Sequence, residues 1–193
     1  MDLELSEDQL ELRDNIRTVL NDASPPSLAR EIHEGRGDHS ALWSTMVELG
    51  WPALGVPESD GGIGLGFVEV GLLAEELGRA TSPGPLLATV SQFVPALIEF
   101  GHHDLLAGVA AGDVTGALAL GEGSRWELSL VATTVSGPDN RLNGCKSAVL
   151  SGAHVDKYLA VARDASNGHL GLFLADRSQA IINDAGLIEP EIG

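Results

Sequence analysis

Cysteine is almost missing from this chain of 193 residues, which contains Cys145 and no other. A single cysteine cannot form a disulfide within the chain, and no cysteine and histidine spacing typical of a metal site surrounds it. The first ten residues are acidic and polar, without the basic start and apolar run of a signal peptide, and no apolar stretch reaches the length of a membrane span. We therefore expect a cytoplasmic protein without a structural metal or a membrane anchor.

Basic residues are also scarce, because 11 lysines and arginines face 28 aspartates and glutamates, for a formal net charge of −17. Such an acidic surface repels phosphate backbones and anionic lipid headgroups. We therefore expect neither nucleic acid nor a membrane surface as a partner. The same acidity is typical of a protein that needs solubility or salt tolerance, and this ordinary interpretation is the stronger of the two.

Hydrophobic residues make up 44% of the chain, enough for the core of one domain or of two small ones. They recur at helical spacing as far as about Gly112, whereas from Val114 onward they form short β-branched runs separated by turn residues. The sequence therefore predicts a helical domain over residues 1–112 and a β-rich domain over residues 113–193.

Start and stop signals divide the first part into five helices. Ser6 and Gln9 fit a capping box at the start of the first helix, a proline pair begins the second, and Gly50 ends the third. The fifth helix, over residues 85–100, is apolar almost all round, so we expect it to be buried and kinked at Pro95. The core positions expected in the first and fourth helices are Leu12, Ile16, Val19, Leu20, Val68, Leu72, Leu73 and Leu77.

Five strands are predicted in the second part, over residues 115–120, 128–135, 141–150, 157–162 and 170–175. Residues 136–140 (SGPDN) have the composition of a turn. They should join the second and third strands as a hairpin.

No self-contained catalytic constellation is present. The glycine-rich residues 61–66 (GGIGLG) follow no predicted strand and precede no P-loop lysine, which favours a tight connection between helices. Residues 121–124 (GEGS) follow a strand and are as typical of an ordinary turn as of a ligand-binding one. Ser124 and Ser151 lack the surroundings of a hydrolase nucleophile, and the adjacent Glu75 and Glu76 face different ways on a helix.

Several separated motifs nevertheless resemble acyl-CoA dehydrogenases. Residues 49–58 (LGWPALGVPE), 61–66 (GGIGLG) and 74–79 (AEELGR) are similar to the N-terminal helical domain of that family. Residues 5–9 (LSEDQ) resemble its first helix, and residues 142–146 (LNGCK) resemble a hairpin of its middle β-domain. The resemblance covers nearly the whole chain in the order of the family.

The resemblance implies an α+β fold, with an all-α N-terminal domain followed by part of an antiparallel β-barrel or sandwich domain. It implies that the family's C-terminal four-helix bundle is absent from these residues. The glutamate that removes the α-proton of the acyl-CoA lies in that bundle, so no catalytic residue is assigned here. FAD is the cofactor that the resemblance implies, as acceptor of the β-hydride.

The resemblance also implies a set of binding residues. Ser124 and Arg125 are expected at the acyl-CoA entrance, where Arg125 or Lys146 would meet the CoA phosphates. The family has a threonine where this chain has Gly121, and a tryptophan and a threonine where it has Ala148 and Leu150, so those flavin contacts are lost and backbone contacts remain. The residues expected against the flavin are Leu118, Leu120, Gly121, Glu122, Ala148, Leu150 and Ser151.

Three functions remain open at this point. The first is the N-terminal portion of an FAD-dependent acyl-CoA dehydrogenase for fatty or steroid-derived substrates, acting in a homo- or hetero-oligomer with electron-transfer flavoprotein as electron acceptor. The second, motivated by Gly121, Ala148 and Leu150, is a flavin-poor, non-catalytic subunit of a heteromeric dehydrogenase. The third is an oligomerisation scaffold, motivated by the apolar helix over residues 85–100.

Overall fold

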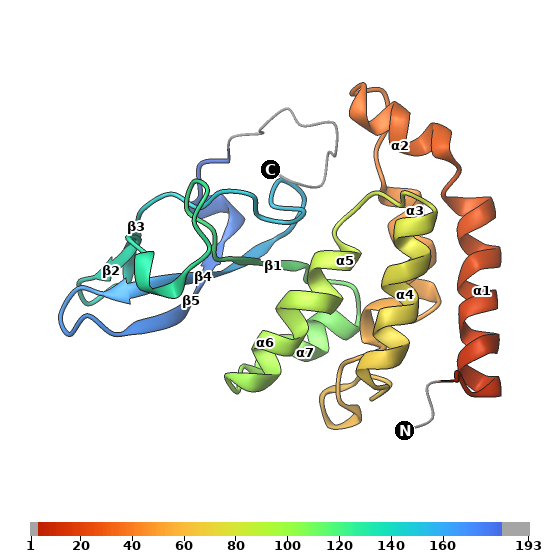
Figure 1. Ribbon diagram of the computed structural model, residues 1–193, viewed down its shortest axis with the longest axis horizontal. Helices are drawn as coiled ribbons and strands as arrows, with labels where there is room; N and C mark the ends of the chain where they lie inside the picture. Colours follow the sequence, from red (N-terminus) through yellow and green to blue (C-terminus); the bar gives the residue numbers. More distant parts are fainter. Residues whose placement is uncertain (1–3, 183–193) are drawn as a thin grey trace. The chain divides into compact units, whose positions relative to one another are not determined.

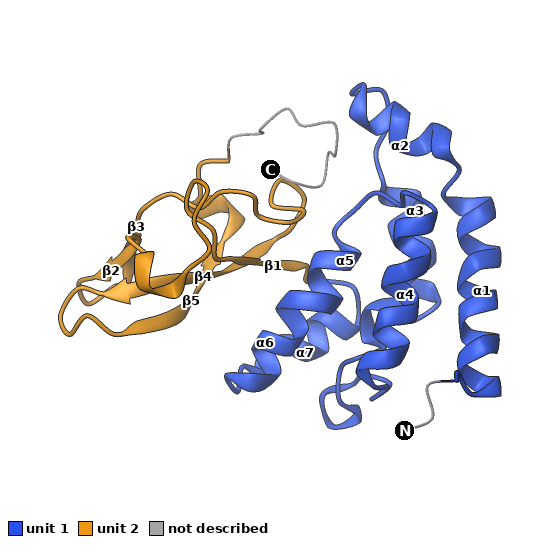
Figure 2. Ribbon diagram, viewed as in Figure 1, with its two compact units in different colours: residues 1–113 blue, residues 114–193 orange. Residues whose placement is uncertain are grey.

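The computed structural model describes residues 4–182 and divides the chain into two compact units between Asp113 and Val114 (Figure 2). The first unit is helical and the second is built on a β-sheet, which confirms the predicted α+β fold class. No helix within residues 4–182 is long and apolar enough to cross a membrane. Within the same residues, no group of three or more histidine, cysteine, aspartate and glutamate side chains is placed to hold a metal ion.

Within the described residues, the helical unit contains seven α-helices (Figure 1). Two 3-10 turns, Trp51–Ala53 and Glu58–Asp60, lie in the connection between α3 and α4, so the glycine-rich residues 61–66 form a link between helices, as predicted. The helices are α1 (Glu7–Ala23), α2 (Pro26–His33), α3 (Ser40–Glu48), α4 (Phe67–Arg79), α5 (Leu86–Ala88), α6 (Val94–Glu99) and α7 (His103–Ala110).

Local sequence signals set the ends of several helices. Ser6 caps α1, because its hydroxyl accepts from the amide of Gln9 while the Gln9 side chain accepts from the amide of Ser6, so the predicted capping box is confirmed. Gly50 adopts a left-handed conformation, with φ of 72°, directly after the C-cap of α3. That conformation ends the helix where the sequence predicts it.

The core of the helical unit lies where α1, α3 and α4 meet, and α1 and α4 lie side by side (Figure 1). Ile16 and Leu20 of α1 are buried, as predicted. The prediction for Val68 is wrong, because its side chain is 53% exposed and Val70 is buried instead. The apolar stripe of α4 includes Val70, Leu73 and Leu77, at helical spacing, and Val68, in the first turn, lies outside this stripe.

The segment predicted as one kinked helix over residues 85–100 contains a π-helical turn, Thr89–Phe93, between α5 and α6. Pro95 lies in the first turn of α6, where its missing amide is tolerated. The wider π turn before it relieves the clash that a proline ring makes with the carbonyl four residues earlier. Phe93 and Leu97 are buried, but Phe100 is 59% exposed, so the segment is not buried on all faces.

The β unit is a mixed sheet rather than the antiparallel one that the sequence predicted. β4 pairs in parallel with β1 and with β2, whereas β2–β3 and β4–β5 are antiparallel pairs. β1 and β2 both pair with a strand far along the chain, which a local sequence pattern does not reveal. The sheet is not closed within the described residues. Its strands are β1 (Gly116–Ala119), β2 (Thr134–Ser136), β3 (Arg141–Asn143), β4 (Lys157–Asp164) and β5 (Leu170–Asp176).

The predicted hairpin around residues 136–140 is confirmed, since β2 and β3 pair across it with Val135 opposite Leu142. Both strands are shorter than predicted. Residues 128–130 form a 3-10 turn instead of a strand, and residues 144–149 leave the sheet as a loop.

Candidate functional site

The candidate site starts at the end of β1, where residues 120–125 leave the sheet through a tight turn. The amide of Glu122 donates to the carbonyl of Arg125 at 3.0 Å, and the amide of Arg125 donates back at 3.1 Å. Gly123 takes the left-handed conformation, with φ of 63°, that such a turn requires. Ser124 and Arg125 are exposed at the turn.

The loop after β3 packs against this turn, so two segments that the sequence assigned to one site do meet. The amide of Ser147 donates to the carbonyl of Gly121 at 2.9 Å, and the Ser147 hydroxyl donates to the carbonyl of Gly123 at 2.9 Å. Ala148 follows directly, exposed and in a left-handed conformation with φ of 51°. The strand end and residues 146–147 therefore form one continuous structure.

An ion pair with little solvent exposure joins the two segments, since the side chains of Lys146 and Glu122 are 11% and 15% exposed. Lys146 Nζ lies 2.7 Å from Glu122 Oε1 and 3.2 Å from the carbonyl oxygen of Leu120. Glu122 also accepts from the Thr133 hydroxyl at 2.6 Å and from the amides of Ala132 and Thr133. Burial raises the pKa of the Glu122 carboxyl, but the hydrogen bonds from Lys146, Thr133 and the two amides outweigh it and lower that pKa to about 2.

Trp126 lies against Gly121, a contact that the sequence did not predict. A Cβ placed on Gly121 would be 2.9 Å from the carbonyl oxygen of Ser147 and 3.3 Å from Cη2 and Cζ3 of the Trp126 indole. Gly121 is buried, whereas Trp126 is 55% exposed. The sequence offers one signal for this contact. Trp126 stands within a run of polar turn residues, in a chain that contains only three tryptophans.

The remaining predicted residues occupy different environments. Leu118 lies within β1 opposite Leu159 of β4 and is half-buried, like Leu120 and Leu150. Ser151 is 1% exposed and left-handed, with φ of 53°, so its hydroxyl is closed off from solvent. The exposed binding candidates are therefore Ser124, Arg125 and Ala148.

The residues at the strand end do not fit a flavin held as the resemblance implies. A threonine at position 121 would collide with the backbone oxygen of Ser147. The polar side chains of Glu122, Lys146 and Ser147 are already bonded within the β unit. An indole, rather than a hydroxyl, covers the position of residue 121.

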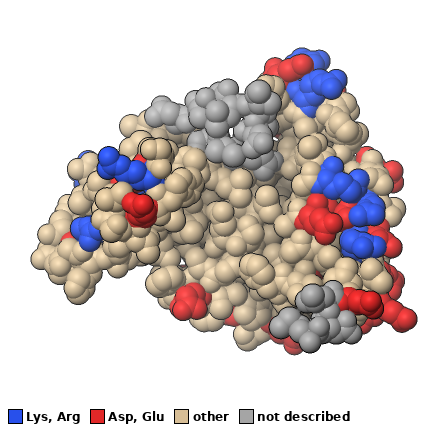
Figure 3. Space-filling view, in the orientation of Figure 1, with Lys and Arg blue, Asp and Glu red and all other residues tan. Residues whose placement is uncertain are grey.

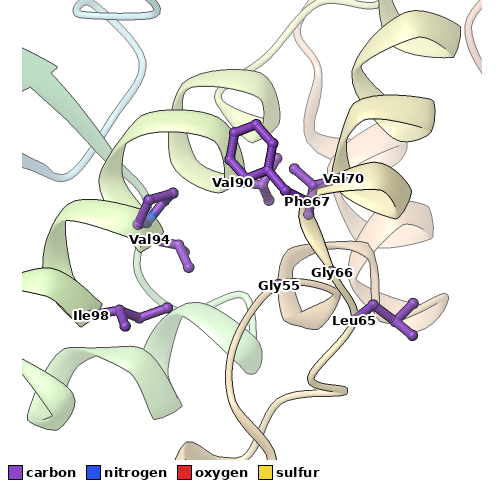
Figure 4. A pocket seen from close by; sticks show the side chains of 9 residues that line it. Gly55, Leu65, Gly66, Phe67, Val70, Val90, Val94 and Ile98 are labelled. Atoms are coloured by element: carbon purple, nitrogen blue, oxygen red, sulfur yellow. The ribbon is translucent and has the colours of Figure 1, made fainter. Parts of the chain in front are cut away.

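The helical unit carries a cavity of about 240 Å³ between the start of α4 and the segment that includes the π turn and α6 (Figure 4). Phe67, which is 73% exposed, stands at its edge. The lining contains no polar side chain, so the cavity has no group for acid–base or nucleophilic chemistry. The lining residues are Gly55, Leu65, Gly66, Phe67, Val70, Val90, Val94, Pro95 and Ile98.

Known proteins similar to this chain include an acyl-CoA dehydrogenase and a benzylmalonyl-CoA dehydrogenase. Residues 6–113 match the family model described as acyl-CoA dehydrogenase, N-terminal domain. The acyl-CoA dehydrogenase FadE28 of Mycobacterium tuberculosis is 39% identical over 127 residues, which are 64% of this chain and 37% of that protein. Benzylmalonyl-CoA dehydrogenase of Aromatoleum aromaticum is 27% identical over 186 residues, 92% of this chain and 49% of that protein.

Solved structures show the same fold. The ChsE4–ChsE5 complex from Mycobacterium tuberculosis matches 91% of this chain and 49% of its own, with a TM-score of 0.75 and 27% identity. The Tcur3481–Tcur3483 steroid ACAD variant matches 88% of this chain and 48% of its own, with a TM-score of 0.75 and 30% identity. This chain spans less than half the length of the curated relatives cited above. Because the family model covers more than half of the sequence, the chain belongs to the acyl-CoA dehydrogenase family.

Proposed function

We propose that this chain supplies the N-terminal helical domain, residues 1–112, and part of the middle β-domain, residues 113–193, of an acyl-CoA dehydrogenase. The observation that carries the proposal is the joint match of the helical and β units, in one chain order, to one half of solved dehydrogenases. The complete enzyme would remove the α-proton and the β-hydride of an acyl-CoA, with FAD as hydride acceptor.

The base for the α-proton comes from outside this half in our proposal. An efficient general base has a pKa near the working pH. Glu76 and Glu122 are the buried or nearly buried carboxylates that we find paired with cations, and hydrogen bonds hold the pKa of each at about 2. Such groups hold their charge to position other residues and accept a proton only weakly.

We propose that this chain contacts the CoA of its substrate at the turn after β1. CoA is a polyanion, and the chain carries few cations against its charge of −17. Lys146 is occupied by Glu122 and Leu120, with its side chain 11% exposed, so it is removed from the candidates for the CoA phosphates. Arg125 and the Ser124 hydroxyl are both exposed, and we assign the phosphate contact to them.

The names of similar proteins support a class of substrate and of partner. A benzylmalonyl-CoA dehydrogenase and a steroid ACAD favour an acyl group that carries rings. The ChsE4–ChsE5 complex favours an assembly of two kinds of subunit. The electron transferring flavoprotein of Acidaminococcus fermentans, 28% identical with a TM-score of 0.74, supports an electron acceptor of the same type.

The experiment is purification of the tagged chain from its native host, followed by an assay of the isolated assembly with ring-bearing and straight-chain acyl-CoAs and a ferrocenium dye as acceptor. We expect dye reduction that depends on acyl-CoA, and a loss in apparent affinity for acyl-CoA in Arg125→Ala. Arg141→Ala, which removes an exposed cation elsewhere in the β unit, is the matched control. If neither the ring-bearing nor the straight-chain acyl-CoAs supported dye reduction by the assembly, the proposed function would be rejected.

A further inference from the structure

We propose that Trp126 seals the end of β1, so that this chain holds no FAD of its own there, within the dehydrogenase assembly proposed above on which this inference rests. The proposal concerns the surface formed by Gly121, Glu122, Trp126, Lys146 and Ser147, which we call the sealed strand end.

The backbone at Gly121 leaves no room for a side chain that could bond a flavin. The Ser147 amide holds the Gly121 carbonyl at 2.9 Å, and the Ser147 carbonyl oxygen lies 2.9 Å from the position of a Cβ on Gly121. The obstacle is a backbone atom fixed by that hydrogen bond, so it cannot rotate away as a flexible side chain does. A hydroxyl at position 121 would need the whole loop after β3 to move.

The indole of Trp126 occupies the space beside Gly121. Two of its ring carbons, Cη2 and Cζ3, lie 3.3 Å from the same Cβ position, so a side chain at position 121 would also press against the indole. A second planar ring could reach Gly121 only after the indole had left. Leu128, which follows in the same segment, is equally exposed at 55% and has no such contact with Gly121.

The polar side chains of the sealed strand end already have hydrogen-bond partners within the chain. The Glu122 carboxylate accepts from Lys146, from the Thr133 hydroxyl and from two amides, and Lys146 also donates to the Leu120 carbonyl. Ser147 uses both its amide and its hydroxyl toward the turn. A flavin that took any of these partners would leave a buried donor or acceptor unpaired, which costs free energy.

The first test is titration of the purified chain with FAD while tryptophan emission is recorded. The emission of Trp126 is the difference between wild type and Trp126→Phe, which separates it from Trp43 and Trp51. We expect this difference to show no saturable quenching up to about 1 mM FAD. Saturable quenching of Trp126, retained in the control Leu128→Ala, would overturn the proposal.

The second test uses the assembly isolated through this chain. We expect Trp126→Ala and Leu128→Ala to leave the FAD content per assembly at the wild-type value, because the flavin lies on another chain. Loss of FAD in Trp126→Ala with retention in Leu128→Ala would show that the indole holds the cofactor and would overturn the proposal. The outcome is independent of the proposed function, which acyl-CoA-dependent dye reduction decides.

Discussion

Two carboxylates, one in each unit, carry much of the specific polar structure: Glu76 is buried and Glu122 is nearly so. Glu76 of α4 is fully buried, and Arg17 of α1 binds it with Nη2 at 2.6 Å from Oε1 and Nε at 3.0 Å from Oε2. Arg79 adds a bond of 2.6 Å to Oε2. The ion pair of Arg17 with Glu76 thus joins α1 to α4. In the same way, the ion pair of Glu122 with Lys146 joins the end of β1 to the loop after β3.

Glu76→Gln should destabilise the helical unit by about 3 kcal/mol, because it removes the charge that two guanidinium groups share in a buried position. Urea unfolding followed by circular dichroism measures the change. Glu75→Gln, at the exposed neighbouring position, should change the free energy of unfolding by less than about 0.5 kcal/mol. Equal effects of the two substitutions would contradict the role of the Glu76 cluster.

The same carboxylates predict how stability depends on pH. Hydrogen bonds from Arg17, against an opposing effect of burial and with further bonds from Arg79, lower the pKa of Glu76 to about 2, and the pKa of Glu122 is also about 2. The pKa of each carboxyl in the folded state lies below its ordinary value of 4.5, so the unfolded state binds more protons and stability is lost as pH falls toward 2. Thermal unfolding between about pH 7 and about pH 3 should show a falling Tm, with a shallower fall in Glu76→Gln. Parallel curves would refute this linkage.

Lys146→Met should destabilise the β unit by about 2 kcal/mol, because Glu122 keeps its nearly buried position and loses its cation. The matched control is Lys157→Met, which removes a cation whose partner Asp176 is 52% exposed, and which should cost less than about 1 kcal/mol. Chemical unfolding monitored by Trp126 emission reports on this unit. A smaller cost for Lys146 than for Lys157 would be inconsistent with our description of the pair.

At the scale of elements, the sequence predicted what local chemistry determines. The capping box at Ser6, the helix end at Gly50 and the hairpin before β3 all depend on residues close together in the chain. The parallel pairing of β1 with β4 depends on residues far apart, so no local pattern reveals it. The prediction that Val68 is a core residue failed because an apolar residue in the first turn of a helix is compatible with either of two adjacent apolar stripes.

The candidate site shows the same limit. The sequence placed Gly121, Glu122, Ser124 and Arg125 on one turn, which a run of turn residues after a strand indicates. The contact of Trp126 with Gly121 and the pairing of Lys146 with Glu122 arise from folding two segments together. In our proposal, these two contacts exclude a flavin more strongly than does the lack of a threonine hydroxyl at Gly121 and Leu150.

Two glycines of the helical unit should respond to alanine in opposite directions. Gly71 lies inside α4 with open space around its Cβ position, so Gly71→Ala should stabilise by up to about 1 kcal/mol. A Cβ on Gly62 would lie 2.0 Å from the carbonyl oxygen of Val56, so Gly62→Ala should destabilise the loop before α4. Thermal unfolding separates the two, and a higher Tm for Gly62→Ala than for Gly71→Ala would disprove this account of the loop.

At the scale of the whole molecule, charge and length are the relevant features. On the face shown in Figure 3, charged side chains gather over α1 at one edge of the helical unit and are sparse on the β unit. The chain matches about half of each of the two solved structures cited above. Stability and binding are therefore best measured both on the chain and on its assembly.

The central claim, that this chain is a flavin-free part of an acyl-CoA dehydrogenase, is tested most directly by the ratio of FAD to copies of each polypeptide in the assembly isolated through it. We predict an assembly whose flavin absorbance is bleached by acyl-CoA and which contains a second dehydrogenase polypeptide, with no more FAD molecules than copies of that second polypeptide. One FAD for every copy, in an assembly with no second dehydrogenase polypeptide, would contradict the account.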